Sequence, residues 1–341
     1  MGFYLSYASM QSSKYIKDDI LQALLNQLPH NIDKICLINN LCLLTPQQKI
    51  ENLNQILAEY DLIPISLSNL SKNFCVNNLC VNNEEILPVN SLSKSHLVSV
   101  LVTAFNAQDT IAVCLNSLLK QTWCNLQIIV INDASTDNTQ QIIEQFAKND
   151  TRIMAVNLPE NVGTFAAKTI GARYALGEFL TCQDSDDFAH PQKIERQILP
   201  LINNSNLMAT ISYWLRLDED GNYYSRQYFP FLRQNTASPL FRRKQVEQET
   251  GLWHLVRMGA DSEFLARLKL VYGDKKILAI KAPLTIASHR MESLTNSGDF
   301  GVQNKESILK RLDYWEWWNL QHIECLARKE KLSVSNLIKN P

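Results

Sequence analysis

The stretch LVSVLVTAFN, at residues 97–106, decides the fold of this chain, because it is an apolar run that ends in polar residues. A continuous apolar run of this length is typical of a strand that is buried on both faces of a sheet. Three similar runs follow at residues 126–131, 153–156 and 178–182, and apolar residues at helical spacing lie between them. This alternation predicts an α/β domain with a mostly parallel sheet that is flanked by helices.

The segments around this domain have other patterns. Residues 1–65 carry apolar residues at helical spacing and predict a helical N-terminal unit, whereas residues 66–96 are rich in Ser and Asn without periodicity and predict a linker. We therefore expect an α/β domain over residues 97–300 and a C-terminal helical tail over residues 301–341. The tail segment 312–323 contains three tryptophans, so it either packs against the domain or contacts a membrane surface or a partner protein.

Composition excludes several classes of function. The 341 residues include 33 Lys and Arg against 34 Asp and Glu, so no global positive field attracts nucleic acid. The most apolar stretch is too short to span a bilayer, and the first residues lack the pattern of a secretory signal, so we expect a cytoplasmic protein. After Gly2 the next glycine is Gly163, so neither a P-loop nor a dinucleotide-binding fingerprint can be placed.

Polar residues follow three of the predicted strands, at 103–106, 132–137 and 183–187. Ligands of open α/β sheets bind at the carboxyl ends of the strands, so we expect these polar segments to form the site. Asp184 and Asp186 are two residues apart, and in an extended segment their carboxylates project to the same side. Such oxygen ligands suit Mn²⁺ or Mg²⁺.

The same Asp-x-Asp spacing occurs at Asp218 and Asp220, where Gly221 follows and strand-like runs lie on both sides. This second pair predicts a hairpin turn, so the spacing alone does not define a metal site. The position of Asp184 directly after a buried strand distinguishes the first pair from the second.

Six segments occur in an order that resembles the successive motifs of family-2 glycosyltransferases with the GT-A fold, over roughly residues 97–295. The segments are residues 98–106, 118–122, 129–139, 161–163, 175–178 and 184–187. The resemblance implies a site for a nucleoside diphosphate sugar, in which Thr103, Phe105 and Asp133 contact the base and ribose. The complete donor site implied in this way comprises Thr103, Phe105, Asn106, Asp133, Gly163, Lys168, Asp184, Ser185 and Asp186. Lys168 stands where the family usually has arginine, and it is either a phosphate contact or a solvated helix residue.

The resemblance also implies the residues that act on the acceptor. Asp261 corresponds to the carboxylate that takes the proton of the acceptor hydroxyl, with Glu263 as the alternative base and a helix cap as the structural role. Trp253 and His254 are expected on the acceptor side, close to this base. His289 is a candidate third metal ligand beside Asp184 and Asp186, and the alternative is an ordinary hydrogen-bonded histidine.

The resulting hypothesis is a metal-dependent inverting glycosyltransferase. It would move a sugar from a UDP-sugar to the hydroxyl of a glycan or lipid-linked glycan, in the synthesis of a bacterial capsule or another surface polysaccharide. Two alternatives remain at this stage. One is a nucleotidyltransferase, which uses similar carboxylates, and the other is a non-catalytic module that binds a nucleotide sugar or a glycan.

Overall fold

The computed structural model describes residues 25–28, 31–81, 95–226, 229–290 and 305–335. Its main strands are β3 (Val98–Ala104), β4 (Leu126–Asn132), β5 (Ile153–Asn157), β6 (Phe179–Asp184), β7 (Phe188–Ala189), β8 (Ala209–Leu217), β9 (Tyr223–Tyr224), β10 (Arg233–Gln234), β11 (Leu240–Arg242) and β12 (Ile277–Ser288). In the described part of the chain these ten strands form one sheet of order β5-β4-β3-β6-β11-β8-β12-β7, with β9 and β10 paired to β8. The predicted α/β class is confirmed.

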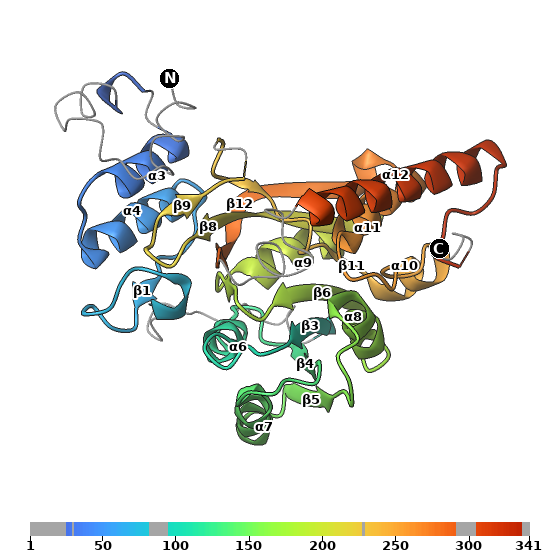
Figure 1. The fold of residues 1–341 in the computed structure, drawn as a ribbon, viewed down its shortest axis with the longest axis horizontal. Coiled ribbons are helices and arrows are strands. Elements are labelled where there is room, and N and C mark those ends of the chain that lie inside the picture. The colour runs from blue at the N-terminus through green and yellow to red at the C-terminus, as the bar shows by residue number, and fades with distance from the viewer. Residues whose placement is uncertain (1–24, 29–30, 82–94, 227–228, 291–304, 336–341) are drawn as a thin grey trace.

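The first half of the sheet is parallel and is covered on both faces. Strands β5, β4, β3 and β6 run parallel, as the apolar runs predicted. Helices α6 (Ile111–Leu119) and α7 (Thr139–Asn149) cover one face, and α8 (Thr164–Ala172) covers the other (Figure 1). Because successive strand residues point to opposite faces, Val100 packs with the α6 side and Leu101 with the α8 side.

The second half of the sheet is mixed, although its two long strands, β8 and β12, are parallel, so the sheet is mostly parallel as predicted. Strand β11 pairs antiparallel with both β6 and β8, and β12 then runs parallel to β8. The helices of this half are α9 (Lys193–Asn203), α10 (Arg243–Glu249), α11 (Ala260–Tyr272) and the 3-10 turn η3 (Asp274–Lys276). The Asp218–Gly221 segment connects β8 to β9 as an antiparallel hairpin, so the predicted turn is confirmed.

The N-terminal region is joined to the sheet by a shared core. Helices α3 (Ile32–Leu41) and α4 (Pro46–Ala58) bury apolar residues in one cluster with Leu215 and Leu284 of the sheet. The predicted linker is wrong for residues 66–80, which form β1 (Ser66–Leu67), η1 (Val76–Asn78) and β2 (Leu79–Cys80) and bury Phe74 in the same cluster. The helical pattern at residues 16–24 and the linker segment 82–94 lie outside the described residues.

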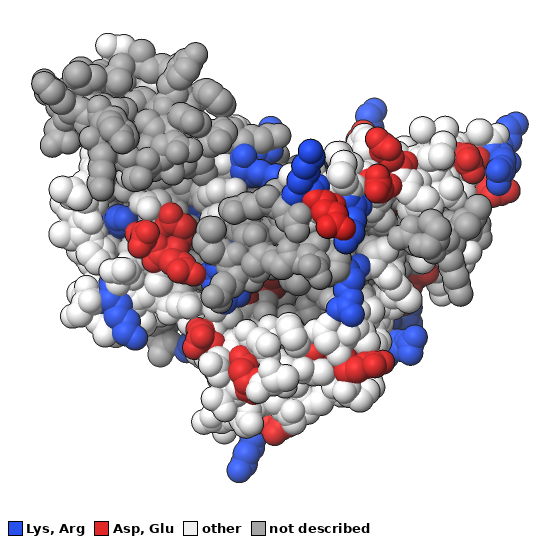
Figure 2. Space-filling view, in the orientation of Figure 1, with Lys and Arg blue, Asp and Glu red and all other residues white. Residues whose placement is uncertain are grey.

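The C-terminal helix α12 (Lys305–Ala327) packs on α11, at the upper right of Figure 1. Tyr314, Trp318 and His322 are buried, so the packing alternative for the tryptophan-rich tail is confirmed. Trp315 and Ile323 remain exposed on the same helix. Within the described ranges, no helix is long and apolar enough to cross a bilayer. Acidic and basic side chains alternate over the face drawn in Figure 2, in keeping with the near-zero net charge.

Candidate active site

The register of the sheet brings the predicted polar segments to one edge. Thr103 of β3 lies opposite Asp184 of β6, and Ala104 lies opposite Asn132 of β4. The residues that follow each strand therefore meet at the carboxyl edge, where ligands of such sheets bind. The candidate site is built there.

Asp133 shapes the turn that leads into α8. Its two carboxylate oxygens accept hydrogen bonds from the backbone N–H groups of Val162 (2.8 Å) and Gly163 (2.9 Å). Gly163 has a φ of 86°, in the region that favours glycine, and its position allows α8 to begin at the next residue. Asp133 is buried, so its observed role is to hold this turn, and the predicted ribose contact would be additional to it.

The residues after β3 provide a polar rim with one exposed aromatic ring. Thr103 Oγ1 lies 2.8 Å from Thr164 Oγ1 at the start of α8. Asn106 accepts a hydrogen bond from the backbone of Thr136 (2.9 Å), which ties the ends of β3 and β4 together. Phe105 between them is 49% exposed. An aromatic face that is left open beside a binding edge is suited to stacking on a planar ring.

Lys168 joins two of the predicted site residues. Its Nζ lies 3.8 Å from Asp184 Oδ1 and 3.4 Å from Asp261 Oδ1, and its side chain is only 1% exposed. Burial alone would lower the pKa of Lys168, but the charges of Asp261 and Asp184 outweigh burial and raise this pKa above its ordinary value. The solvated alternative for Lys168 is therefore wrong. We name Lys168, Asp184 and Asp261 the Lys168 cluster.

Asp261 lies in the first turn of α11, which begins after Gly259 in a left-handed conformation. Burial raises the pKa of the Asp261 carboxyl, while Lys168 and a hydrogen bond with Trp253 act in the opposite direction. A carboxylate with a raised pKa is a better proton acceptor than a fully solvated one. Trp253 is buried in an aromatic cluster with Phe241 and Phe264, so it touches the predicted base from the core side.

The other carboxylates after β6 have separate partners. Asp186 pairs with Arg290 at 3.1 Å, and burial together with the charge of Asp184 raises the pKa of Asp186. Asp187 is buried and accepts a hydrogen bond from the backbone N–H of Ser288 (2.9 Å), which fixes the end of β12 beside the site. Ser185, between the two aspartates of the motif, is partly buried.

The predicted three-residue metal shell is not formed. No group of three or more His, Cys, Asp or Glu side chains in the described part of the chain could hold a metal ion. His289 instead stacks on Tyr224, with ring centroids 3.5 Å apart, and burial lowers its pKa to about 4. Asp184 and Asp186 remain as a pair of oxygen donors. Mg²⁺ commonly binds through one or two carboxylates with substrate phosphates and water as the other ligands, so this pair fits such a cation.

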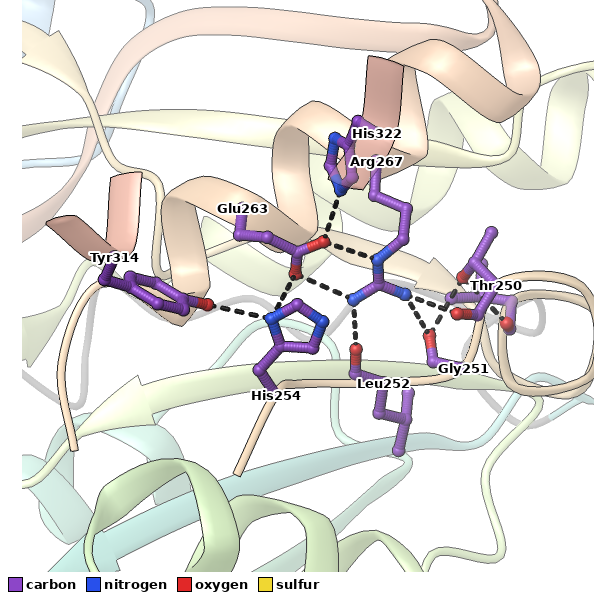
Figure 3. Close-up of polar contacts among 9 residues, drawn as sticks. Thr250, Gly251, Leu252, His254, Glu263, Arg267, Tyr314 and His322 are labelled. Carbon is purple, nitrogen blue, oxygen red and sulfur yellow. Dashed lines mark hydrogen bonds and ion pairs between the residues drawn. The ribbon is translucent and has the colours of Figure 1, made fainter. Parts of the chain in front are cut away.

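Glu263, two residues after Asp261, has a different environment. Its carboxylate accepts hydrogen bonds from Arg267 Nε (2.8 Å) and lies 2.9 Å from His322 Nε2 of α12 (Figure 3). The side chain is 0% exposed, and although burial would raise its pKa, the contacts with His322 and Arg267 lower it to about 2. A buried carboxylate of such low basicity cannot serve as the alternative base, which corrects that prediction.

Arg267 connects this carboxylate to the loop before α11. Its guanidinium donates to the backbone carbonyls of Thr250, Gly251 and Leu252 (Figure 3). The next two residues of that loop are Trp253 and His254. The sequence contained one signal for this pair, because Glu263 and Arg267 stand at i and i+4 on a helix.

His254 belongs to the same buried group, and its place on the acceptor side stays a prediction. Its Nδ1 lies 2.9 Å from the hydroxyl of Tyr314 in α12, and burial lowers its pKa to about 4 (Figure 3). We name Glu263, Arg267, His254, His322 and Tyr314 the Glu263 cluster. It ties α11, α12 and the loop at residues 250–254 together.

Arg257 is a site residue that the sequence did not indicate. Its guanidinium donates to the side chain and to the backbone carbonyl of Asn161, in the turn that Asp133 also holds. Its side chain also covers Gly163, where an added Cβ would lie 2.9 Å from Arg257 Cδ. No local pattern links residues that are 96 positions apart, so only the fold reveals this contact.

Comparison with known proteins identifies the class. Residues 99–263 match the family model described as glycosyl transferase family 2. The chain is 34% identical over 131 residues to glycosyltransferase GlyG of Streptococcus pneumoniae, covering 38% of this chain and 43% of that protein. It is 34% identical over 125 residues to the putative teichuronic acid biosynthesis glycosyltransferase TuaG of Bacillus subtilis, covering 37% and 49%. The chain therefore spans less than half the length of either relative.

Among solved structures, S. aureus TarS 1-349 in complex with UDP-GlcNAc aligns with a TM-score of 0.49 and 19% identity, over 59% of this chain and 61% of that one. The family match covers the parallel half of the sheet, the Lys168 cluster and Glu263. Residues 99–263 are therefore a domain of the glycosyl transferase family 2 type.

Proposed function

We propose that this protein transfers a sugar from a nucleoside diphosphate donor to the hydroxyl of a glycan acceptor, with inversion at the anomeric carbon. The observation that carries the proposal is the Lys168 cluster. A carboxylate at the nucleotide-binding edge of the sheet and a carboxylate at the start of α11 lie within 4 Å of one buried ammonium. The carboxylate proposed to act on the donor and the carboxylate proposed to act on the acceptor therefore lie in one small region.

Asp261 acts as the general base in this proposal. It accepts the proton of the acceptor hydroxyl while the hydroxyl oxygen bonds to the anomeric carbon, and the bond from that carbon to the diphosphate oxygen breaks. The raised pKa of Asp261 supports this role. Lys168 holds the carboxylate in place and favours its ionised form, which is the form that accepts a proton.

The donor lies along the carboxyl edge of β3, β4 and β6. Phe105 stacks on the base, and Thr103, Asn106 and the turn at Gly163 surround the ribose and diphosphate. Asp184 and Asp186 would hold a divalent cation, Mn²⁺ or Mg²⁺, which when bound neutralises charge on the departing nucleoside diphosphate. Uridine is the nucleoside that we propose.

The acceptor is proposed to be a growing surface polysaccharide. The printed name of the relative TuaG refers to teichuronic acid biosynthesis, and a hyaluronan synthase of Pasteurella multocida is 26% identical over 175 residues. Both names concern polysaccharides, which makes a glycan acceptor the first class to test.

The proposal is tested by release of the nucleoside diphosphate from UDP-sugars, with and without Mn²⁺. We expect Mn²⁺-stimulated release in the wild type and loss of release in Asp186→Ala. Asp220→Ala is the matched control, because Asp220 has the same Asp-x-Asp spacing but lies exposed in the hairpin after β8. Equal release by wild type and Asp186→Ala would contradict the proposal, and release of pyrophosphate from a nucleoside triphosphate and a sugar phosphate would support a nucleotidyltransferase instead.

A further inference from the structure

A cavity of about 250 Å³ lies between the start of α11 and the helix α12. Its wall includes Gly259 and Ser262, which flank Asp261 in sequence, and Trp315 and Trp318 of α12. This volume is just below the range of about 300–1,000 Å³ that is usual for small-molecule sites, so it suits a single sugar ring. None of the residues of the proposed donor site lines this cavity.

The cavity is positively charged. Arg226 and Arg311 line it from different parts of the chain, and none of the described residues that line it is acidic. Burial and the positive charge of Arg226 both lower the pKa of Arg311, in keeping with the place of both arginines on the wall of one cavity. Two neighbouring guanidinium groups repel each other, and an anion between them would relieve this repulsion through charge-assisted hydrogen bonds.

The cavity also offers aromatic surface. The ring centroids of Trp315 and Trp318 are 6.1 Å apart at an interplanar angle of 77°, so the two indoles present differently oriented surfaces. Trp315 is 53% exposed although it is large and apolar. Indole faces pack well against the C–H faces of sugar rings, and large exposed aromatic residues beside a cavity are typical of a binding surface.

The wall formed by α12 is held in a defined position. Tyr314 lines the cavity and also bonds to His254, and His322 on the same helix contacts Glu263 of α11. Figure 3 shows these two contacts on either side of the Glu263 carboxylate. The Glu263 cluster therefore sets the distance between the two helices and preserves the cavity.

We propose that this cavity binds the acceptor through an anionic group, a phosphate or a carboxylate carried on or next to a sugar ring, with the arginines holding the charge and the tryptophans holding the ring. The inference rests on the proposed function, because Gly259 and Ser262 of the cavity wall lie within two residues of the proposed base Asp261, which makes the occupant the acceptor.

The test is a titration of tryptophan fluorescence in the full chain with glucose 1-phosphate, glucuronic acid and glucose at low salt. We expect at least one anionic probe to bind about tenfold or more tightly than glucose, since charge-assisted contacts are the stronger ones. The anionic probe that binds more tightly identifies the charged group as phosphate or carboxylate. The preference is expected to disappear in Arg226→Gln/Arg311→Gln and to persist in Arg328→Gln, which changes an exposed arginine of the same C-terminal segment.

Two further variants separate this cavity from the donor site. Asp184→Asn/Asp186→Asn is expected to retain the preference for the anionic probe, whereas loss of the preference there would place the probe in the donor site and overturn the inference. Equal binding of all three probes, or unchanged preference in the double arginine variant, would also overturn it. Failure of the proposed function is seen separately, as absence of nucleoside diphosphate release by a wild type that still binds the anionic probe.

Discussion

Asp261 and Glu263 stand two residues apart in the first turn of α11, yet the structure gives them opposite properties. Asp261 reaches the carboxyl edge of the sheet, where burial raises its pKa and one ammonium is its charged partner. Glu263 turns into the core, where Arg267 and His322 lower its pKa to about 2. The Lys168 cluster is therefore suited to proton transfer, and the Glu263 cluster is suited to holding elements together. Burial and partners, and not residue type, separate the two roles.

The largest expected effect comes from removing the basicity of Asp261. Asp261→Asn keeps the size of the side chain but cannot accept the proton, so we expect turnover to fall about 10²–10⁴-fold. The thermal unfolding midpoint should change little, because Lys168 keeps Asp184 as a partner. Steady-state release of nucleoside diphosphate with a competent acceptor measures the first quantity, and calorimetry measures the second. Turnover within a factor of two of the wild type would remove Asp261 from the role of base.

The next effect concerns stability. Arg267→Ala leaves the Glu263 carboxylate buried without its guanidinium and removes the guanidinium bonds to three loop carbonyls, so we expect the free energy of unfolding to fall by about 3–5 kcal/mol. Urea unfolding measures this quantity. Arg328→Ala is the control, because Arg328 pairs with Glu324 on the surface and should change stability by less than about 1 kcal/mol. Similar losses in both variants would show that the buried cluster does not hold the helices together.

A smaller change in stability is expected from a change in pH. Burial lowers the pKa values of His190, His254 and His289 to about 4, against 6.5 for an ordinary histidine. Between these values the unfolded chain binds protons that the folded chain does not, so stability is complete above about pH 6.5 and is lost as the pH falls toward 4. His254→Asn should take up fewer protons on unfolding than the wild type, by up to about one proton. The slope of its unfolding free energy against pH should be smaller for this reason. A wild-type stability that stays constant over this range would contradict the assignment.

The parallel half of the fold could be predicted from the sequence because each strand is a continuous apolar run. The strand order of the mixed half could not be predicted. Strands β9 and β10 have two residues each and β11 has three, and strands of this length are too short for a periodic signal. Residues 66–80 carry a linker-like composition because Ser and Asn dominate them, although they are folded in the structure. The amide of Asn78 donates to backbone carbonyls of the same segment, including that of Asn69, and so replaces the bonds that regular structure would provide.

The candidate site was predictable to the extent that it lies at strand ends. The sequence predicts Asp184 at the donor site and Asp261 as the base, but it does not predict Lys168 between them, because a helix residue at that position is equally compatible with exposure to solvent. His322 contacts Glu263 across 59 positions, and no pattern in the sequence of α12 marks that histidine. Contacts between distant segments decide which acidic residue is buried with a partner, and this information is present only in the folded chain.

The central claim is that one buried ammonium joins the donor carboxylate Asp184 to the base Asp261. The pH dependence of kcat/KM in the wild type and in Lys168→Met tests it most directly, because this profile reports the pKa of the free enzyme's base. Lys168 lowers the pKa of Asp261, so its removal should move the acid limb to higher pH by about one unit, while Lys168→Arg should stay near the wild type. An acid limb at the same pH in Lys168→Met and the wild type would contradict the claim.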